Sequence, residues 1–153
     1  AERSEMSRRF EGKVVAVTGS GKERGLGQAI LQRFADEGAA CVVSDLKIDA
    51  EAEGVARELR ARGATVEAIA CDVSDAAQCT ALVERTVALF GRIDVMVNNA
   101  GIGFMMKPML DVDPKDWDLV IRVNLSGAFY CTQAAARAMI AAGRGGRIIN
   151  IAS

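Results

Sequence analysis

Residues 14–27 have the sequence VVAVTGSGKERGLG, and this stretch indicates the fold of the chain. Its first four residues are apolar and rich in β-branched side chains, a run too short for a helix and typical of a buried parallel strand. A glycine-rich turn follows, and residues 28–37 then carry apolar side chains at helical spacing. Glycines let the backbone approach a pyrophosphate, and the first turn of a helix points free N–H groups at it. This order of elements therefore predicts a dinucleotide site.

The glycine spacing leaves two alternatives open. Gly19, Gly25 and Gly27 do not fit G-x-G-x-x-G, because five residues separate the first two, so an ordinary strand-to-helix turn is one alternative. A P-loop is the other, but it needs a glycine at position 16 and a hydroxyl residue at position 23, where the chain has Ala16 and Glu23. The magnesium-binding hydroxyl of a nucleoside triphosphatase would be missing. Dinucleotide binding is therefore favoured.

The composition is typical of a globular protein. The 153 residues are enough for one domain with a sizeable core, and 50% of them are apolar. A net charge of −1 creates no field that would recruit nucleic acid or an anionic membrane, and no apolar run approaches the length of a bilayer span. Residues 1–12 are polar and lack the apolar core of a secretory signal, so we interpret them as a flexible arm.

The cysteines indicate packing rather than metal binding. Cys41, Cys71, Cys79 and Cys131 lie far apart in sequence, and the chain has no histidine. No metal site is expected from this pattern. Buried, reduced thiols in a cytoplasmic protein are the simplest interpretation.

Strand and helix patterns alternate along the chain. After the opening strand and helix, strands are predicted at residues 39–45, 65–71, 93–97 and 147–151, and helices at 49–62, 75–90 and 125–142. A further helix opens at Asp113 and Pro114, which suit its cap and first turn. The alternation predicts an α/β fold, a doubly wound parallel sheet with helices on both faces. Ligands of such sheets bind at the carboxyl ends of the strands.

The helix that opens at Asp113 is expected to bury one side, which consists of Trp117, Val120 and Ile121. The long Ala-rich helix at residues 125–142 carries one stripe of side chains, namely Phe129, Thr132, Ala136 and Met139. Cys131 also falls on an apolar helix face.

Acidic residues follow two of the predicted strands. Asp45 ends the second strand, where a carboxylate accepts hydrogen bonds from both ribose hydroxyls of an adenosine and repels a 2′-phosphate; helix capping is the alternative. Lys22 and Arg24 favour NADP instead, since a cation can pair with the 2′-phosphate that distinguishes NADP from NAD. We expect NAD rather than NADP. Asp72 is placed to accept from an adenine amino group or, alternatively, to cap the turn into the next helix.

Amides mark two more positions. Asn98, Asn99, Ala100 and Gly101 follow a buried strand, where small residues leave room for a flat ring and a ribose and amides can join neighbouring strands; a simple turn is the alternative. Asn124 interrupts a helical pattern at a cost of some tenths of a kcal/mol relative to Ala. Solvent exposure is one explanation. The other is a helix kink that presents a carbonyl or an amide to a proton relay.

These residues together resemble the signatures of the short-chain dehydrogenase/reductase family. The resemblance extends from Lys13 to Ser153. Its matching segments are Thr18-Gly19 with Gly25-Leu26-Gly27, Asp45, Asp72-Val73, Asn98-Asn99-Ala100-Gly101, Asn124, and the strand of residues 148–153 that ends in Ala152-Ser153.

The resemblance implies a Rossmann-type fold and an oxidoreductase that transfers a hydride between NAD(H), or less favourably NADP(H), and a secondary alcohol or ketone. It implies that Ser153 is the catalytic serine, which hydrogen-bonds the substrate oxygen, and that Asn124 holds a water in the proton relay. It also implies a homo-oligomer, a dimer or a tetramer, when full length. The cofactor-binding residues that it implies are Gly19, Gly25, Leu26, Gly27, Asp45, Asp72, Val73, Asn98, Ala100 and Gly101.

The chain departs from the family pattern twice. Its glycine loop is two residues longer than T-G-x-x-x-G-x-G, a spacing that also resembles the divergent enoyl reductases of the same superfamily. The family's Tyr-x-x-x-Lys pair should follow the serine, and the only tyrosine, Tyr130, has Ala134 four places on. We therefore expect the 153 residues to be part of a longer chain, with the last strands of the fold missing. The alternative is a non-catalytic or split dinucleotide-binding module.

Overall fold

The computed structural model describes residues 8–104 and 107–152. Among these residues, five strands form one sheet in the order β3-β2-β1-β4-β5, and every neighbouring pair is parallel. The predicted doubly wound parallel sheet is confirmed. The strands are β1 (Val14–Thr18), β2 (Ala40–Asp45), β3 (Val66–Ala70), β4 (Val95–Asn98) and β5 (Arg147–Asn150).

The central strand β1 explains why the sheet has two covered faces. All five of its residues are buried, and β2 and β4 flank it in register, with Val15 opposite Cys41 on one side and Val95 on the other. The chain leaves β1 toward β2 in one direction and later returns on the other side to β4. The crevice at this reversal is the place where α/β sheets bind ligands.

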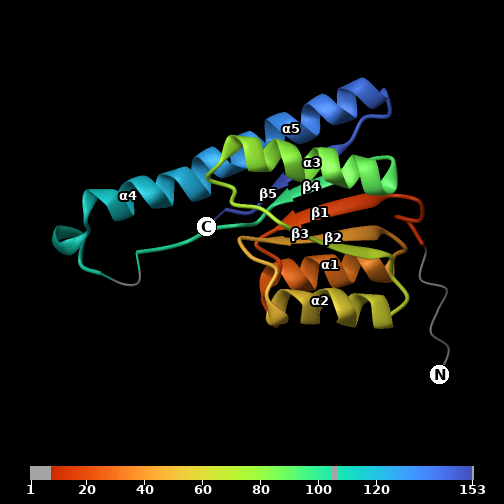
Figure 1. The fold of residues 1–153 in the computed structure, drawn as a ribbon, viewed down its shortest axis with the longest axis horizontal. Coiled ribbons are helices and arrows are strands. Elements are labelled where there is room, and N and C mark those ends of the chain that lie inside the picture. Colours follow the sequence, from red (N-terminus) through yellow and green to blue (C-terminus); the bar gives the residue numbers. More distant parts are fainter. Residues whose placement is uncertain (1–7, 105–106, 153) are drawn as a thin grey trace.

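Helices cover both faces of the sheet (Figure 1). The helices α1 (Leu26–Asp36) and α2 (Ala50–Ala61) lie on one face, and α3 (Ala76–Phe90) and α5 (Gly127–Ala142) lie side by side on the other. Successive residues of a strand point to opposite faces, so Val15 and Val17 join Leu31 and Leu59 in one buried cluster, while Ala16 joins the cluster beneath α3 and α5.

Local signals in the sequence fix the helix ends. Asp49 and Asp75 accept hydrogen bonds from the first backbone N–H groups of α2 and α3. Asp113 does the same for α4 (Pro114–Ile121), accepting from Lys115 N at 2.8 Å, which confirms the predicted helix start. Gly143 ends α5 in the left-handed conformation, with φ of +65°.

The predicted buried face of α4 is wrong. Trp117 is 53% exposed and Ile121 is exposed as well, while Val120 is half-buried. The reason is visible in Figure 1, where α4 extends beyond the end of the sheet, so that the sheet cannot cover its apolar side chains. Helical spacing predicts an apolar face but does not show what covers that face.

The stripe of Phe129, Thr132, Ala136 and Met139 is not the buried face of α5. Phe129 is 59% exposed, Thr132 and Ala136 are half-buried, and Met139 is buried. The fully buried residues of α5 are Gly127, Cys131, Ala135 and Met139, at a spacing of four. Alanines on several sides of this helix make its apolar spacing fit more than one face, so the pattern could not identify the buried one.

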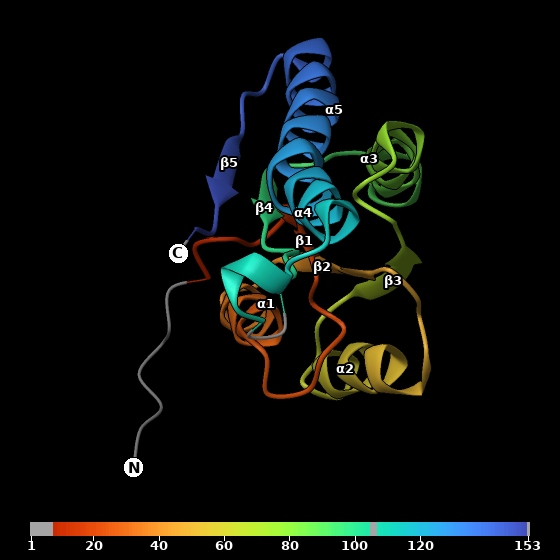
Figure 2. The same cartoon turned by 90° about the vertical axis from the view of Figure 1, so that its left-hand side faces the viewer.

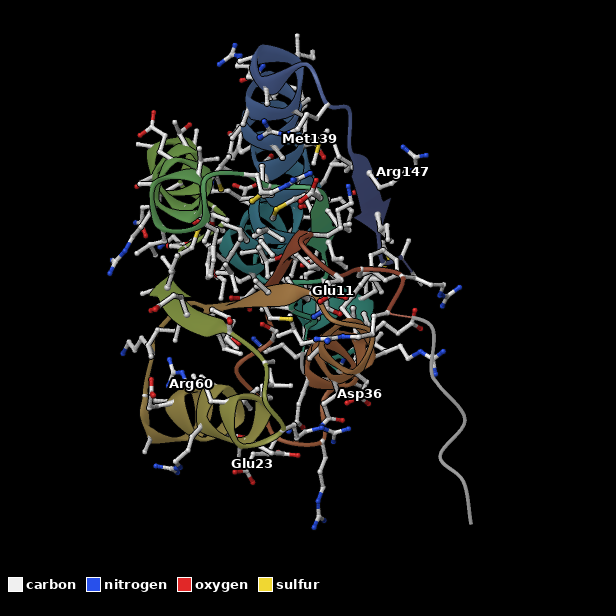
Figure 3. All side chains as sticks on the ribbon, turned by 90° about the vertical axis from the view of Figure 1, so that its right-hand side faces the viewer. Glu11, Glu23, Asp36, Arg60, Met139 and Arg147 are labelled. Carbon is white, nitrogen blue, oxygen red and sulfur yellow. The ribbon has the colours of Figure 1, made fainter. Side chains whose placement is uncertain are left out.

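The strand β5 forms an edge of the sheet. It packs against α5 on one face, and the other face is open in the part of the chain that the structure describes (Figure 2). Ile149 and Ile151 are each about two-fifths exposed as a result. Arg147 points away from this edge, whereas Met139 lies between α5 and the sheet (Figure 3).

Residues 8–12 contact the corner between α1 and β2. Phe10 N donates to Glu37 O at 3.0 Å. The Phe10 and Phe34 rings pack edge-to-face, with 4.8 Å between their centroids. Arg9 makes two hydrogen bonds with the carboxylate of Glu37, and Arg33 makes another. The first seven residues of the predicted arm lie outside the described residues. None of the described helices has the length and apolar character needed to cross a bilayer.

Candidate functional site

The turn between β1 and α1 approaches neighbouring backbone so closely that only glycine fits. Gly19 has φ of +62°, and a Cβ built there would lie 2.7 Å from the Cα of Ala100. A Cβ on Gly27 would lie 2.7 Å from the Cα of Ser20 and 2.8 Å from the amide nitrogen of Asn99. Any side chain at either position would force the loop away from the residues after β4.

Thr18 and Asn99 join this turn to the end of β4. The hydroxyl of Thr18 accepts from the backbone N–H groups of Asn99 and Ala100, both at 3.2 Å. The side-chain amide of Asn99 donates to the carbonyl oxygens of Thr18 and Gly19, at 3.0 and 2.9 Å. The predicted role of amides in joining neighbouring strands is therefore seen at Asn99.

Asn98, the last residue of β4, connects this strand to α5 and β5. Its amide nitrogen donates to Thr132 Oγ1 of α5 at 3.0 Å and to Asn150 Oδ1 of β5 at 2.8 Å. Its side-chain oxygen Oδ1 is buried and accepts no hydrogen bond from the described residues. Asn98 thus fixes β5 and α5 relative to β4 rather than lining an open surface.

The longer glycine loop is held by side chains within it. Ser20 Oγ donates to Val17 O at 2.7 Å and accepts from Ser44 N at 3.1 Å, so the start of the loop is fastened between β1 and β2. Farther along, Arg24 has φ of +58°, and its N–H donates to Gln28 Oε1.

Asp45 ends β2 directly beside the loop. Its Oδ2 accepts from Gly21 N at 2.9 Å and its Oδ1 accepts from Leu46 N at 2.8 Å. Asp49, not Asp45, caps α2. Each carboxylate oxygen keeps further acceptor capacity, because a carboxylate offers about four lone-pair sites.

Asp72 and Val73 form the turn after β3. Asp72 Oδ1 accepts from both the N–H and the hydroxyl of Ser74, at 2.9 and 2.7 Å, while Asp75 is the cap of α3. The alternative that Asp72 caps the turn into the next helix is therefore confirmed, while the helix itself is capped by Asp75. Val73 packs so tightly on α5 that a Cβ on Gly127 would lie 2.8 Å from its side chain.

These turns surround a groove of about 320 Å³ at the carboxyl ends of the strands. The groove brings together six of the residues predicted from sequence: Gly19, Asp45, Asp72, Val73, Ala100 and Gly101. The others, Gly25, Leu26, Gly27, Asn98 and Asn124, do not line it. A larger hollow of about 600 Å³ opens at the amino ends of the strands. Two arginines that line this hollow are already engaged in 2.7 Å ion pairs, Arg62 with Asp36 and Arg92 with Asp94.

Sequence reasoning missed several lining residues of the groove. Cys71 and Ile102 belong to it, as does Val123 from the helix after α4. Cys71 precedes Asp72 in sequence and could have been found from that position. For Val123 no signal existed, because only the tertiary fold brings it to this edge.

Asn124 lies in a π-helical turn, residues Arg122–Ser126, between α4 and α5. Its Oδ1 accepts from Ile102 N and its Nδ2 donates to Ile102 O, both at 2.8 Å. A Cβ on Gly101 would lie 3.5 Å from the same Oδ1. Asn124 is exposed, as the first of the two explanations for it predicts, and the helix is also irregular at this position. Turns of this π-helical kind are frequent at functional sites. Ser153 lies outside the described residues.

A parallel sheet with a close-packed glycine turn at its strand-order reversal defines a dinucleotide-binding type of α/β protein. The family model "short chain dehydrogenase" matches residues 13–153. The chain belongs to the short-chain dehydrogenase/reductase family, as its sequence signatures predict.

Curated relatives agree with this assignment. An uncharacterized oxidoreductase of Thermotoga maritima is 45% identical over 146 residues, which cover 94% of this chain and 54% of the relative. A sorbitol dehydrogenase of Cereibacter sphaeroides is 39% identical over 145 residues, covering 95% of this chain and 54% of the relative. The chain thus spans about half the length of the curated relatives it matches.

Solved structures share the fold. A metagenomic short-chain oxidoreductase in complex with NADP has a TM-score of 0.86 at 38% identity, covering 94% of this chain and 63% of that one. NAD⁺-bound xylitol dehydrogenase has a TM-score of 0.87 at 35% identity, covering 95% of this chain and 54% of that one. Both coenzymes therefore occur among structures with this fold.

Proposed function

We propose that this chain is the dinucleotide-binding portion of an oxidoreductase that transfers a hydride between NAD(H) and a secondary alcohol or ketone. The observation that carries the proposal is the close approach of Gly19 to Ala100 and of Gly27 to Ser20 beside the 320 Å³ groove. Such glycines admit a pyrophosphate to the backbone. In this proposal, residues 13–153 form one dinucleotide-binding unit and residues 1–12 an arm.

The residues present fit a nicotinamide dinucleotide. The N-cap of α1 is Gly25, which has no side chain to accept hydrogen bonds from the first turn of the helix. The N–H groups of Leu26 and Gly27 in that turn are therefore available to an anion. Asp45 and Asp72 line the groove that starts at Gly19. In the proposed complex, the pyrophosphate binds at the glycine turn and the adenosine lies between these two carboxylates.

NAD is the proposed coenzyme. Asp45 lines the groove with acceptor capacity to spare, as a ribose diol requires, and its negative charge would repel a 2′-phosphate. Lys22 lines the same groove and would favour that phosphate. We weigh Asp45 more heavily, because its position is fixed by the hydrogen bond from Gly21, whereas a lysine side chain has many rotamers.

The proposed catalytic roles belong to Ser153 and Asn124. The nicotinamide ring, when bound, supplies the hydride chemistry. Ser153 donates a hydrogen bond to the substrate oxygen. The Asn124 side chain is committed to Ile102, so the proposed part of Asn124 in a proton relay falls to its main-chain carbonyl, which lies in the π-turn. The names of the related sorbitol and xylitol dehydrogenases support a hydroxyl-bearing substrate.

The proposed homo-oligomer has support in the apolar side chains on the outside of α4 and α5. Trp117, Phe129 and Ile140 are each more than half exposed. Large exposed apolar residues on adjacent helices are typical of surfaces that other protein segments cover.

The test is the oxidation of polyols and secondary alcohols by the intact protein, followed by NADH absorbance. We expect Ser153→Ala to lower kcat at least about 100-fold, the scale of a lost acid–base or positioning group, while the Kd for NADH stays within about twofold. An unchanged kcat would contradict the catalytic role of Ser153. Saturable NADH binding without turnover of any substrate would instead favour the non-catalytic module.

A further inference from the structure

The helix α2 supports the glycine loop, residues 19–27, from outside. Gly21 packs so closely on this helix that a Cβ built there would lie 2.8 Å from the Cβ of Ala52. Glu23 N donates to Glu51 Oε1 in the first turn of α2 at 3.0 Å. A Cβ on Gly54 of the same helix would lie 3.3 Å from the Glu23 carboxylate. The first half of the loop therefore lies against α2.

A bridge of side chains holds the second half of the loop. The N–H of Arg24 donates to Gln28 Oε1 on α1. The other end of the same amide, Gln28 Nε2, donates to Glu58 Oε2 on α2 at 2.8 Å. The second carboxylate oxygen, Glu58 Oε1, accepts from Gln32 Nε2 at 3.0 Å. Glu58 thus fixes the Gln28 amide, and this amide holds the backbone of the loop.

The bridge stabilises a backbone conformation that is unfavourable by itself. Arg24 has φ of +58°, in the left-handed region that residues with a side chain rarely adopt. Gln28 is only 6% exposed, so water cannot easily replace the partners of its amide. The next residue in the loop, Gly25, is the N-cap of α1, and its N–H donates to Lys22 O at 3.2 Å. A change of conformation at Arg24 would therefore move the start of α1.

We propose that Glu58 is a positioning residue for the coenzyme, which acts through Gln28 and Arg24 to hold the glycine loop in the conformation that binds a pyrophosphate. This inference rests on the proposed function, in which the pyrophosphate binds at the first turn of α1. The Arg24 N–H is already bound within the protein, so the bridge acts by ordering the loop and not by contact with the coenzyme. A loop that is ordered before binding loses less entropy when the ligand arrives, which raises affinity.

The charge of Glu58 by itself predicts the opposite effect. A carboxylate near an anion repels it, so removal of this charge would strengthen binding of a pyrophosphate. Loss of the bridge would weaken the same binding. The direction of the change in affinity therefore distinguishes positioning from electrostatics.

The experiment measures the Kd of the intact protein for NADH by fluorescence, and those for ADP and adenosine by competition. Glu58→Ala should weaken binding of NADH and ADP about fivefold, the scale of one lost hydrogen bond, and leave adenosine within about twofold, because adenosine lacks the pyrophosphate. The KM for NAD should rise by the same factor while kcat at saturating NAD stays unchanged. Glu53→Ala is the matched control, since Glu53 lies on the same helix and pairs with Arg60 at 2.7 Å, and it should not change any of these constants.

A reciprocal exchange tests the bridge itself. Gln28→Glu alone sets two carboxylates against each other and should weaken NADH binding at least as much as Glu58→Ala. In the double variant that combines Gln28→Glu with Glu58→Gln, the carboxylate at position 28 accepts from Arg24 N and from the amide at position 58. The oxygen of that amide still accepts from Gln32. The Kd for NADH should return to within about twofold of the wild-type value, because every hydrogen bond of the bridge is restored. Circular dichroism shows whether each variant is folded.

The outcomes separate this role from the proposed function. Unchanged or tighter NADH binding in folded Glu58→Ala protein would overturn the positioning role alone, if the wild-type protein binds NADH. Equal losses for ADP and adenosine, or a double variant that does not recover, would overturn it as well. Absence of NADH binding in folded wild-type protein would contradict the proposed function and the positioning role together.

Discussion

The side chain of Asn124 pairs with the backbone of Ile102 through two 2.8 Å hydrogen bonds, one accepted from the N–H and one donated to the C=O. The pair joins the π-turn between α4 and α5 to the loop that follows β4. Only a primary amide can both donate and accept in this way. Asn124 therefore determines how the helix after α4 lies against the groove.

Replacement of Asn124 tests this relationship. Asn124→Ala removes both hydrogen bonds and should lower the free energy of unfolding by about 1–3 kcal/mol. Asn124→Asp should lower the free energy of unfolding at least as much, because a carboxylate cannot donate a hydrogen bond to the Ile102 carbonyl. Urea unfolding measures both. The exposed Gln133 on α5 gives the control, since Gln133→Ala should change the free energy by no more than about 0.5 kcal/mol. A fully stable Asn124→Ala protein would show that the pair contributes nothing.

The close approach of Gly19 to Ala100 predicts a loss of coenzyme affinity on substitution. Gly19→Ala should weaken NADH binding more than about tenfold, because the new Cβ meets backbone and displaces the turn. Gly143→Ala is the matched control: its φ of +65° is similar, but no described atom lies within 4 Å of its Cβ position. Both variants should lose about 1–2 kcal/mol of stability to backbone strain. Equal NADH affinity in the two variants would mean that the Ala100 contact is irrelevant to binding.

Asp45 should control the choice of coenzyme. Asp45→Ala should weaken NADH binding more than NADPH binding, because the ribose acceptor and the repulsion of a 2′-phosphate are lost together. Asp45→Asn keeps an oxygen for Gly21 N and removes only the charge, so it separates the loop contact from electrostatics. Fluorescence titrations with both coenzymes measure the ratio. Equal losses for NADH and NADPH in the alanine variant would count against NAD as the coenzyme.

The lowered pKa of Glu37 should make the stability of the protein depend on pH. The hydrogen bond from Arg9 lowers the pKa of Glu37 from 4.5 to about 2, assisted by Arg33 and opposed by burial. Because the folded pKa lies below the unfolded one, the stabilisation is fully present above pH 4.5 and is lost as the pH falls toward 2. Wild-type protein should thus lose stability more steeply than Glu37→Gln across this window in urea unfolding. Parallel curves for the two proteins would refute the linkage.

The sequence predicts an element correctly where the conformation depends on residues close together in the chain. The apolar run ending at Thr18, the cap Asp113 and the glycine turn all specify their own conformation, and the sheet follows from their order. Asp45, Asp72 and Ala100 line one groove for a related reason, because the carboxyl ends of parallel strands meet at one edge of the sheet.

What the sequence could not show were contacts between distant segments. Asn124 stood out as a helix irregularity, but its partner Ile102 lies 22 residues away and carries no signal of the pairing. Trp117 is exposed although its helical spacing predicts a buried face, because apolar spacing does not reveal where the sheet ends.

Calorimetric titration of the protein with NADH tests the central claim most directly, since every proposed role depends on a dinucleotide in the groove beside Gly19. The account predicts saturable binding of one NADH per chain that Gly19→Ala weakens and Gly143→Ala does not. Absence of heat from NADH and NADPH alike, in folded protein, would contradict it.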